Sequence, residues 1–303
     1  MTDSVLKSLT ASVPGCRFLP DEPMKNHTTF RIGGKARVYC LPETEKALED
    51  VIAFCRTGGV RYMIVGRGSN LLFSDRGFDG AVISSCALDG VAVDALTVRA
   101  GGGAMLSRAA TAAAEKGLAG LEFAHGIPGS VGGAVYMNAG AYDGEISRAV
   151  SAVRVLTADG AIRTLANEEM RFGYRTSVLQ ETGGMVLSAE FSLAAGDREE
   201  IFSHIRELDA KRRDKQPLDR CSAGSFFKRP PGQFAGALIE QAGLKGYSVG
   251  DAQVSEKHAG FIVNNGNATC ADVLRLKDHV VETVERASGV RLEMEVRLAG
   301  DFT

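Results

Sequence analysis

Gly-Ile-Pro-Gly-Ser-Val-Gly-Gly-Ala-Val-Tyr-Met-Asn-Ala-Gly-Ala-Tyr, residues 126–142, is the most informative stretch of this chain. Glycine reaches backbone conformations that are closed to other residues and lets a ligand approach the peptide N–H groups, while Pro128 fixes one backbone dihedral. A backbone of this composition is suited to wrapping a ligand. A tight tertiary turn would account for the same residues, because glycine clusters mark loops in every fold.

A second glycine cluster, Gly66-Arg-Gly-Ser-Asn-Leu71, follows the strand-like run 60–65 and favours ligand binding. Two such clusters predict a long ligand. The nearest alternative is the dinucleotide fingerprint of dehydrogenases, but Leu71 stands where its third glycine belongs, and the pattern over 73–80 indicates turns and not a helix. The triplet Gly101–Gly103 precedes a predicted helix. It is explained either as a strand-to-helix turn or as N–H groups that meet phosphate.

Length, charge and cysteine pattern limit the class of protein. The chain of 303 residues is long enough for two or three domains, and its net charge of -2 without a long basic run gives no sign of nucleic-acid binding. Six cysteines occur without a Cys-x-x-Cys pair or a histidine at ligand spacing, so we expect reduced thiols, no metal site and no disulfide framework. The N-terminus lacks an apolar signal core, and no apolar run is long enough to span a bilayer. These features predict a cytoplasmic protein with no membrane partner, and no obligate protein partner is evident.

Hydrophobic periodicity predicts a mixed chain of helices and strands. An amphipathic helix is expected from Pro42 to about Arg56, with Ala47, Val51 and Cys55 on one face, and a second helix over 104–116. Short strands between glycine turns are predicted at 60–65, 81–84, 96–100, 152–157, 162–165 and 185–193. Strands and helices do not alternate regularly, so the predicted fold class is α+β.

The C-terminal third has its own pattern of elements. Residues 197–215 predict a charged helix with Ile201, Ile205 and Leu208 inward and a basic end, and a domain boundary is expected near it. A loop over 217–232, helices over 234–242 and 271–288, and a strand over 260–264 are predicted after it. The last strand is predicted over 290–298, because one set of residues is apolar (Val290, Leu292, Met294, Val296, Leu298) and alternates with a charged set (Arg291, Glu293, Glu295, Arg297).

Three polar groups are the candidates for chemistry. Ser225 follows a glycine and precedes two aromatic residues and two cations, although a serine in a turn is common. Arg175 lies beside aromatic residues in Phe172-Gly-Tyr-Arg-Thr176, where a solvated arginine is the simpler explanation. Glu295 shares a predicted strand face with Glu293, which could raise the proton affinity of either carboxylate. None of the three is decisive alone.

Together and in this order, the motifs resemble the family of UDP-N-acetylenolpyruvoylglucosamine reductases, flavoenzymes of bacterial peptidoglycan synthesis. The resemblance covers the whole chain and is carried by Asn26–Gly34, Gly66–Asn70, Gly126–Tyr142, Ser222–Lys228, Gly250–Gly260 and Glu295–Arg297. It implies an FAD-binding domain of the vanillyl-alcohol-oxidase (PCMH) type in two α+β subdomains, followed by a C-terminal α+β substrate domain. The expected limits are an N-terminal arm over 1–25, the FAD-binding domain over 26–196 with its subdomains split near 85–95, and the substrate domain over 197–303.

The resemblance also implies roles for individual residues. The family's catalytic arginine, proton-donating serine and glutamate correspond to Arg175, Ser225 and Glu295. Non-covalent FAD would be held by Arg67, Gly68, Ser69, Asn70 and Leu71, and by Gly126, Pro128, Gly129, Ser130, Gly132, Gly133, Asn138, Ala139 and Gly140. The nucleotide sugar or the phosphates of NADPH would be held by Lys215, Lys228, Arg229 and His258.

Two departures from the family pattern matter. Arg229 stands where many members have asparagine, which leaves the polar contact to substrate at that position open. The chain is too short between Arg175 and Ser225 for the tyrosine-bearing insertion of the longer members, so it resembles the short subgroup. We therefore assign no substrate-clamping tyrosine.

The reaction implied by the resemblance has two halves. NADPH reduces FAD, and flavin N5 then delivers hydride to the methylene carbon of the enolpyruvyl ether, so that charge moves onto the neighbouring carbon and its carboxylate. A fixed cation such as Arg175 and a polar partner such as Glu295 would stabilise that charge, and Ser225 would donate the proton. Two alternatives stay open: an FAD-dependent oxidase of the same superfamily acting on a different substrate, with flavin anchored covalently at His125, and a nucleotide-sugar-binding protein without catalysis.

Overall fold

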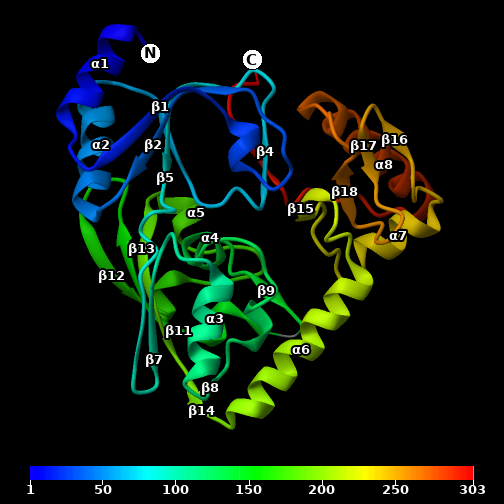
Figure 1. Cartoon of the computed structure of the whole chain (residues 1–303). Coiled ribbons are helices and arrows are strands. Elements are labelled where there is room, and N and C mark those ends of the chain that lie inside the picture. Colours follow the sequence, from blue (N-terminus) through cyan, green and yellow to red (C-terminus); the bar gives the residue numbers. More distant parts are fainter. Residues whose placement is uncertain (143, 303) are drawn as a thin grey trace. The chain divides into compact units, whose positions relative to one another are not determined.

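A computed structural model describes residues 1–142 and 144–302 of the chain. Asp143 and Thr303, which fall within the predicted FAD-binding and substrate domains, lie outside the described residues. The chain divides into two compact units, and each of them is built from separate stretches of sequence (Figure 1). Unit 1 comprises Met1–Leu19, Val38–Arg67 and Gly80–Arg212, and unit 2 comprises Pro20–Arg37, Gly68–Asp79 and the chain from Arg213 onward.

The helices follow the amphipathic patterns of the sequence. In α2, the Thr44 side chain accepts a hydrogen bond from Ala47 N, and Gly58 ends the helix. Its buried side includes Val51, Ile52 and Cys55, which confirms the predicted helix. The α-helices are α1 (Asp3–Ser12), α2 (Glu45–Thr57), α3 (Leu106–Glu115), α4 (Val131–Tyr136), α5 (Leu179–Thr182), α6 (Arg198–Lys215), α7 (Ala235–Gln241) and α8 (Cys270–Ser288).

The larger sheet of unit 1 has the strand order β12-β11-β13-β7-β6, and each neighbouring pair in it is antiparallel. Helices α3 and α4 pack on this sheet (Figure 1), over buried side chains that include Ala109, Val131, Val153 and Phe191. The glycine-rich stretch 126–142 supplies α4, so it is anchored in this core. The strands are β6 (Val91–Asp94), β7 (Thr97–Gly101), β11 (Val150–Leu156), β12 (Ile162–Ala166) and β13 (Met185–Ser192).

A second sheet has the strand order β1-β2-β5-β3, and its β3 and β5 are parallel. The face of α2 that carries Leu48 and Val51 shares a buried cluster with Val38 and Ile83 of the strands. Strand β3 ends at Val65, directly before the second glycine cluster. The sheet therefore fixes the position at which that cluster begins. The strands are β1 (Cys16–Pro23), β2 (Lys35–Pro42), β3 (Tyr62–Val65) and β5 (Phe78–Ser84). Two short ladders also occur in unit 1, formed by β8 (Leu118–Ala119) with β14 (Ala194–Ala195) and by β9 (Gly140–Ala141) with β10 (Gly144–Glu145).

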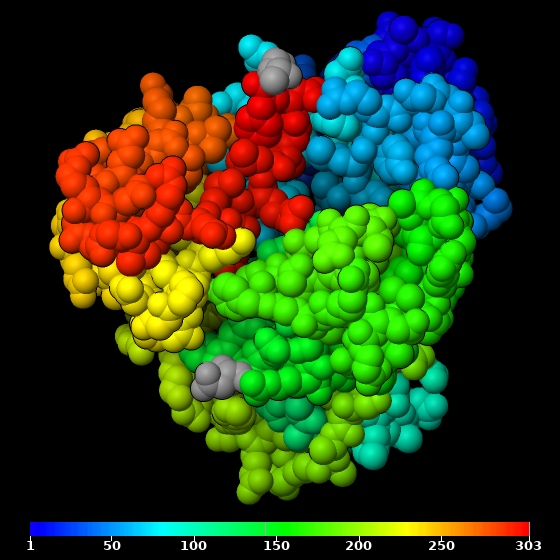
Figure 2. Space-filling view, turned by 180° about the vertical axis from the view of Figure 1, so that it is seen from behind, coloured from blue at the N-terminus to red at the C-terminus, as the bar shows by residue number. Residues whose placement is uncertain are grey.

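Unit 2 contains an antiparallel sheet with the order β15-β18-β17-β16 and a parallel pair of short strands, β4 and β19. Helix α8 packs on β16, β17 and α7, and Val273, Leu276 and Val280 are among its buried residues. Figure 2 shows α8 in orange to red beside the yellow segment that carries α7. The strands are β4 (Leu71–Phe73), β15 (Cys221–Ser225), β16 (Ser248–Val249), β17 (Ala252–Val254), β18 (Phe261–Asn264) and β19 (Arg297–Ala299).

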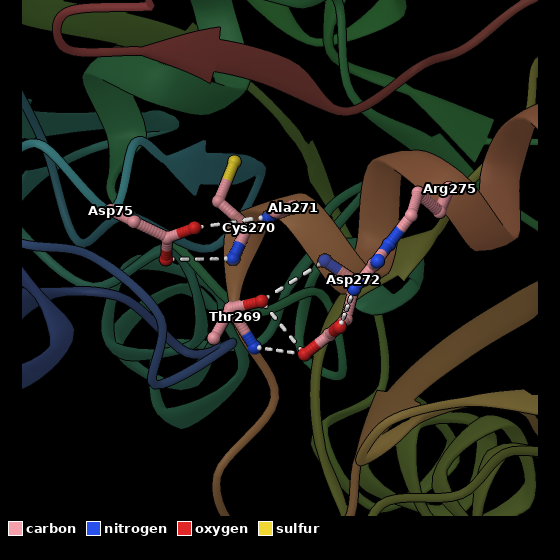
Figure 3. Close-up of polar contacts among 6 residues, drawn as sticks. All are labelled: Asp75, Thr269, Cys270, Ala271, Asp272 and Arg275. Atoms are coloured by element: carbon pink, nitrogen blue, oxygen red, sulfur yellow. Dashed lines mark hydrogen bonds and ion pairs between the residues drawn. The ribbon is translucent and has the colours of Figure 1, made fainter.

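The N-terminus of α8 is held by side chains from two parts of unit 2 (Figure 3). Thr269 and Asp272 form a capping box, in which Thr269 Oγ1 accepts from Asp272 N and Asp272 Oδ2 accepts from Thr269 N, each at 3.0 Å. Asp75, in the turn after β4, accepts from Cys270 N at 2.8 Å and from Ala271 N at 3.0 Å. A carboxylate at this end of a helix satisfies free N–H groups and opposes the helix dipole. Asp75 therefore ties the segment that follows the second glycine cluster to α8.

The predicted loop over 217–232 is wrong in part, because Cys221–Ser225 forms β15. This strand pairs with β18, and the register shifts between Ser222 and Ser225. The segment Cys-Ser-Ala-Gly-Ser shows no apolar alternation, and glycine in particular is unfavourable in strands. The strand therefore depends on pairing with a distant partner, which the local pattern does not reveal.

The predicted strand over 290–298 is also wrong over most of its length, because only Arg297–Ala299 forms a strand, β19. The chain changes its partner on the way: Glu295 N donates to Phe226 O at 2.9 Å, and Arg297 N donates to Asn70 O at 2.9 Å. Leu298, which the alternation assigned to the apolar face, is 44% exposed. The alternation predicts burial correctly for Leu292 and Val296 but not the continuous pairing that a strand requires.

The remaining predicted helices and strands are observed within a few residues of their expected limits, and α6 buries Ile201, Ile205 and Leu208 as predicted. The cysteines are free thiols, and burial raises the pKa of Cys55 to about 11. Among the described helices, none has both the length and the apolar composition needed to cross a bilayer.

Candidate active site

Gly66, the first residue of the second glycine cluster, lies close to the glycine-rich stretch 126–142 within unit 1. A Cβ atom on Gly66 would lie 2.4 Å from Ser130 Oγ, and a Cβ atom on Gly132 would lie 2.9 Å from Gly102 O. Ser130 Oγ accepts from Gly133 N at 3.2 Å and so caps α4, while Gly132 N donates to Gly102 O at 2.8 Å. Contacts this short leave no room for a side chain, so these positions need glycine. The structure thus brings the residue that precedes Arg67 next to Ser130, a predicted ligand-binding residue.

The third glycine cluster is a structural turn. Gly101 N donates to Gly90 O at 2.8 Å, Gly102 N to Leu187 O at 2.7 Å and Gly103 N to Leu88 O at 3.0 Å. Strand β7 ends at Gly101 and α3 begins at Leu106. The interpretation as a strand-to-helix turn is confirmed, because all three N–H groups are used within the protein and are not available to a phosphate.

Arg67 provides a donor that the protein itself does not satisfy. It lies two residues after the end of β3, and its Nε atom is buried without a hydrogen-bond partner among the described residues. Leaving a buried donor unsatisfied costs roughly 1–3 kcal/mol, more for a charged group. A buried guanidinium donor directly after Gly66 fits an anionic ligand with several acceptor atoms, such as a dinucleotide cofactor.

Asn138 lies near the end of the glycine-rich stretch and is almost fully buried. Its Oδ1 accepts from Ser147 N at 2.9 Å, and its Nδ2 donates to Gly173 O at 3.1 Å. Its φ of 42° is left-handed, a conformation that asparagine tolerates better than most residues. Both ends of the side-chain amide are thus used to hold the protein backbone, a role that the sequence did not indicate.

Arg175 lies in a tight turn that is tied to the same stretch. Gly173 and Thr176 exchange two backbone hydrogen bonds, each of 3.2 Å, and Arg175 between them has a φ of 56°. Its Nη2 donates to Gly140 O at 3.3 Å, and its guanidinium lies 5.0 Å from the centre of the Tyr174 ring. Left-handed backbone at a residue other than glycine is strained and is often found at functional sites. The structure therefore brings Arg175 and Gly140, two predicted site residues from different motifs, into contact.

In unit 2, the residue after Ser225 connects it to the chain around Glu295. Phe226 N donates to Gly260 O at 2.8 Å, Phe226 O accepts from Glu295 N at 2.9 Å, and Glu295 O accepts from Asn70 Nδ2 at 3.3 Å. The buried rings of Phe226 and Phe227 pack edge to face at 5.2 Å, which fixes this backbone. Ser225 itself is exposed, at the end of β15. The backbones around Ser225, Glu295 and Asn70 are thus joined in one hydrogen-bonded chain.

Lys228 forms an ion pair with Glu293. Lys228 Nζ lies 3.1 Å from Glu293 Oε2, and Lys228 N donates to Glu293 O at 2.8 Å. The hypothesis that Glu293 raises the proton affinity of Glu295 depended on a continuous strand with both carboxylates on one face. That strand is not formed, and the Glu293 carboxylate has a cation as its partner.

The His258 ring accepts a hydrogen bond from the backbone of its own loop. Its Nδ1 accepts from Gly260 N at 3.1 Å, and its ring packs against Phe261 at 5.1 Å between ring centres. Burial lowers the pKa of His258 below its usual value, so the ring is uncharged at neutral pH. With Nδ1 occupied as an acceptor, the proton of the neutral ring lies on Nε2. His258 can therefore donate to a phosphate from Nε2 without carrying a full charge.

The other predicted phosphate ligands lie on the surface of unit 2. Lys215 is exposed at the end of α6. Near it, Lys257 Nζ donates to Arg213 O at 2.5 Å, a contact that the sequence analysis did not predict. The sequence feature that could have drawn attention to Lys257 is its position within the Gly250–Gly260 motif. The Arg229 guanidinium lies 3.9 Å from the centre of the exposed Phe234 ring and stacks on it as a cation.

His125, at the start of the glycine-rich stretch, has a partner on α6. Its Nδ1 lies 3.0 Å from Asp209 Oδ2, at ion-pair distance, but the direction is not that of a hydrogen bond. Gly126 leaves room for the same helix, because a Cβ atom there would lie 3.1 Å from Asp209 Oδ1. This contact gives His125 a structural partner within unit 1.

Two family models match the chain. The model of an FAD binding domain matches residues 36–166, a range that contains the two glycine clusters. The model of the UDP-N-acetylenolpyruvoylglucosamine reductase C-terminal domain matches residues 216–299, a range that contains Ser225, Lys228, His258 and Glu295. The predicted fold class, an FAD-binding domain followed by a C-terminal α+β domain, is confirmed by these matches and by the mixed helices and strands.

Individual relatives match the chain over its whole length. It is 50% identical to the UDP-N-acetylenolpyruvoylglucosamine reductase of Agathobacter rectalis, with 100% of both chains covered, and 48% identical to that of Caldanaerobacter subterraneus, with 93% of both covered. The crystal structure of UDP-N-acetylenolpyruvylglucosamine reductase (MurB) from Thermus caldophilus is similar, with a TM-score of 0.79 and 39% identity over 93% of this chain and 98% of that one. The resemblance seen in the motifs is therefore confirmed, and the chain belongs to the UDP-N-acetylenolpyruvoylglucosamine reductase family.

Proposed function

We propose that this protein reduces UDP-N-acetylglucosamine enolpyruvate to UDP-N-acetylmuramate with electrons from NADPH, through non-covalently bound FAD, in the synthesis of peptidoglycan precursors. Membership of the family supports the reaction class. The structural observation that carries the proposal is the bond from Arg175 Nη2 to Gly140 O, because it ties a strained arginine to the glycine-rich stretch. The substrate is a small UDP-sugar, and we infer a cytoplasmic enzyme with no obligate protein partner.

The residues present fit an FAD molecule. We propose that the cofactor is held by the Arg67–Leu71 group and by the Gly126–Gly140 group, with the buried Arg67 Nε as one donor. The close approach of Gly66 to Ser130 keeps the backbone directly before Arg67 free of side chains. When bound, FAD supplies hydride transfer between NADPH and the enolpyruvyl group.

Three side chains are proposed to act on the enolpyruvyl group. Addition of hydride to the methylene carbon leaves negative charge on the adjacent carbon and its carboxylate, and the Arg175 guanidinium stabilises that charge. Ser225 donates a proton to the adjacent carbon, which completes the addition of two hydrogen atoms across the double bond. Glu295 is the second polar partner of the developing charge.

The remaining proposed contacts are to phosphate. Lys215, Lys228 and Arg229 supply positive charge, while His258 supplies an uncharged Nε2–H donor. By role, we divide the chain into an N-terminal arm (1–25), an FAD-binding domain (26–196) with subdomains that meet near 85–95, and a substrate domain (197–303). This division follows function along the sequence, whereas the two compact units follow contacts in the fold.

The visible spectrum of the purified protein, combined with acid precipitation, tests the cofactor. The proposal predicts a yellow protein with one FAD per chain, which acid releases intact into the supernatant. A colourless protein that cannot be reconstituted with FAD contradicts it. Flavin that stays with the precipitate favours the oxidase alternative with covalent attachment at His125.

A further inference from the structure

The peptide unit that joins Arg175 to Thr176 is held at both of its ends. Thr176 N donates to Gly173 O at 3.2 Å, and Arg175 O accepts from Gln180 Nε2 at 3.0 Å. The orientation of this plane sets ψ of Arg175, a residue whose φ of 56° is already left-handed. A flip of the plane would break both hydrogen bonds and change ψ of Arg175 while its φ stays positive, so the two bonds hold the turn in one conformation.

Gln180 Nε2 lies within hydrogen-bonding distance of three acceptors, which are two carbonyl oxygens and Met137 Sδ at 3.7 Å. Its Nε2 donates to Arg175 O and also to Tyr136 O, each at 3.0 Å. A side-chain amide nitrogen carries two hydrogen atoms, so each carbonyl can receive one of them. Tyr136 is the last residue of α4, which the glycine-rich stretch forms. Gln180, on the short helix α5, therefore connects the turn of Arg175 to that stretch.

We propose that Gln180 is a positioning residue that fixes the backbone of Arg175 so that the guanidinium lies where negative charge develops. The proposal rests on the proposed function, in which Arg175 stabilises that charge. Gln180 does not touch the reacting atoms, and it acts through the carbonyl of Arg175. Because electrostatic stabilisation depends on a preorganised geometry, a turn that samples other conformations loses rate although its arginine is still present.

The chain offers a matched control in Ser177. Ser177 Oγ donates to Tyr136 O at 2.9 Å, the same carbonyl that Gln180 contacts, but no bond joins its side chain to Arg175 O. Ser177→Ala thus removes a bond to α4 and leaves the peptide after Arg175 held at both ends. Gln180→Glu keeps the shape of the side chain but removes the amide donors and places oxygen atoms against two carbonyl groups. Gln180→Lys restores N–H donors on a side chain of similar reach.

The test is anaerobic stopped-flow reoxidation of NADPH-reduced holoenzyme by the enolpyruvyl substrate. We expect Gln180→Glu to slow reoxidation ~10–100-fold, as a small misplacement of a catalytic group does, and Gln180→Lys to recover part of the loss. Flavin content and the rate of flavin reduction by NADPH are expected to stay at parental values in both variants. Ser177→Ala is expected to reoxidise at close to the parental rate. If Gln180→Glu does not fold, Gln180→Met, which also lacks donors, takes its place.

A double-mutant cycle separates positioning from general loss of structure. In an Arg175→Lys background the guanidinium is already gone, so Gln180→Glu is expected to cause little further loss. An equal fold-loss in both backgrounds overturns the inference, as does parental reoxidation by Gln180→Glu. A parent enzyme whose reduced flavin is not reoxidised by the substrate overturns the proposed function and the inference with it.

Discussion

The charge of His258 is set by its own loop, which buries the ring and occupies Nδ1 with a backbone N–H group. The family resemblance placed His258 among the residues that would hold the nucleotide sugar or the phosphates of NADPH. In the structure its Nδ1 is occupied by Gly260 N, and burial holds its pKa below the usual value. The residue could be found from the motif, but its charge state could not, because burial and the Gly260 contact arise from the folded loop.

His258 gives the stability of the fold a predictable dependence on pH. Its pKa is depressed in the folded state, so the unfolded chain binds the proton more readily, and acid favours unfolding. The contribution of neutral His258 to the free energy of unfolding is fully present above pH 6.5, the ordinary pKa of histidine. It is lost as the pH falls through the lower pKa of the folded state. Urea denaturation of the parent and of His258→Asn, from about pH 8 to about pH 5, checks this. We expect the stability advantage of the parent to shrink towards acid, and an advantage that grows towards acid would contradict the assignment.

The exposed Ser225 is proposed as the general acid, and its loss should be specific to one half-reaction. A positioned general acid contributes ~10²–10⁴-fold in rate, so Ser225→Ala should slow reoxidation of reduced flavin by about that factor. Flavin content and reduction by NADPH should be unchanged, and Ser225→Cys should recover part of the rate. Ser222→Ala is the matched control on the same strand, β15. Reoxidation of Ser225→Ala at the parental rate would mean that another group supplies the proton.

The two glutamates near the C-terminus are expected to behave differently. Glu293 forms an ion pair with Lys228, and both partners are well exposed, so Glu293→Gln should have a mild effect on stability, about 0–1 kcal/mol, and on turnover. Glu295→Gln should lower turnover sharply while NADPH still reduces the flavin at a near-parental rate. Steady-state and half-reaction rates of the two variants distinguish them. Equal losses from both substitutions would count against a role for Glu295.

At the scale of elements, the sequence predicts those that depend on local pattern and misses those that depend on partners. The amphipathic helices α2, α6 and α8 are observed as expected, because their buried faces repeat with the helical period. Strand β15 has no such pattern and forms by pairing with β18. The chain before β19 shows the alternation of apolar and charged residues but no continuous strand, because its backbone partner changes from Phe226 to Asn70. Glycine clusters could be identified as close approaches, but which of them bind ligand depends on whether their N–H groups are already used.

The Asp75 carboxylate is expected to stabilise α8 as a cap at its N-terminus. The carboxylate accepts from two N–H groups of the first turn, in addition to the local capping box (Figure 3). Removal of a capping side chain costs about 0.5–2 kcal/mol, so Asp75→Ala should lower the free energy of unfolding by about that amount. Urea denaturation measures the loss, and Arg76→Ala, at the exposed neighbouring position, serves as the control. Equal stability of Asp75→Ala and the parent would show that the capping box alone suffices.

At the scale of the molecule, the sequence does not predict which segments of the chain make up unit 2. The segments 20–37 and 68–79 belong to the same unit as the C-terminal third. Long-range contacts hold them there, such as Thr29 Oγ1 donating to Ser222 O at 2.7 Å and Asn264 Nδ2 donating to Phe30 O at 3.0 Å. Contacts across such distances in the chain leave no periodic signal, whereas the family motifs that lie in these segments could be recognised.

The measurement that bears most directly on the function is a single turnover of NADPH-reduced holoenzyme with the enolpyruvyl nucleotide sugar under anaerobic conditions. We predict that the substrate restores the absorbance of oxidised flavin within one turnover, and that mass spectrometry finds the product heavier than the substrate by two hydrogen atoms. Arg175→Lys should slow this step and leave flavin reduction by NADPH intact, since its charge is needed only when negative charge develops on the substrate. Flavin that stays reduced in the presence of the substrate, and is reoxidised only when oxygen is admitted, would contradict the proposed reaction and point to an oxidase.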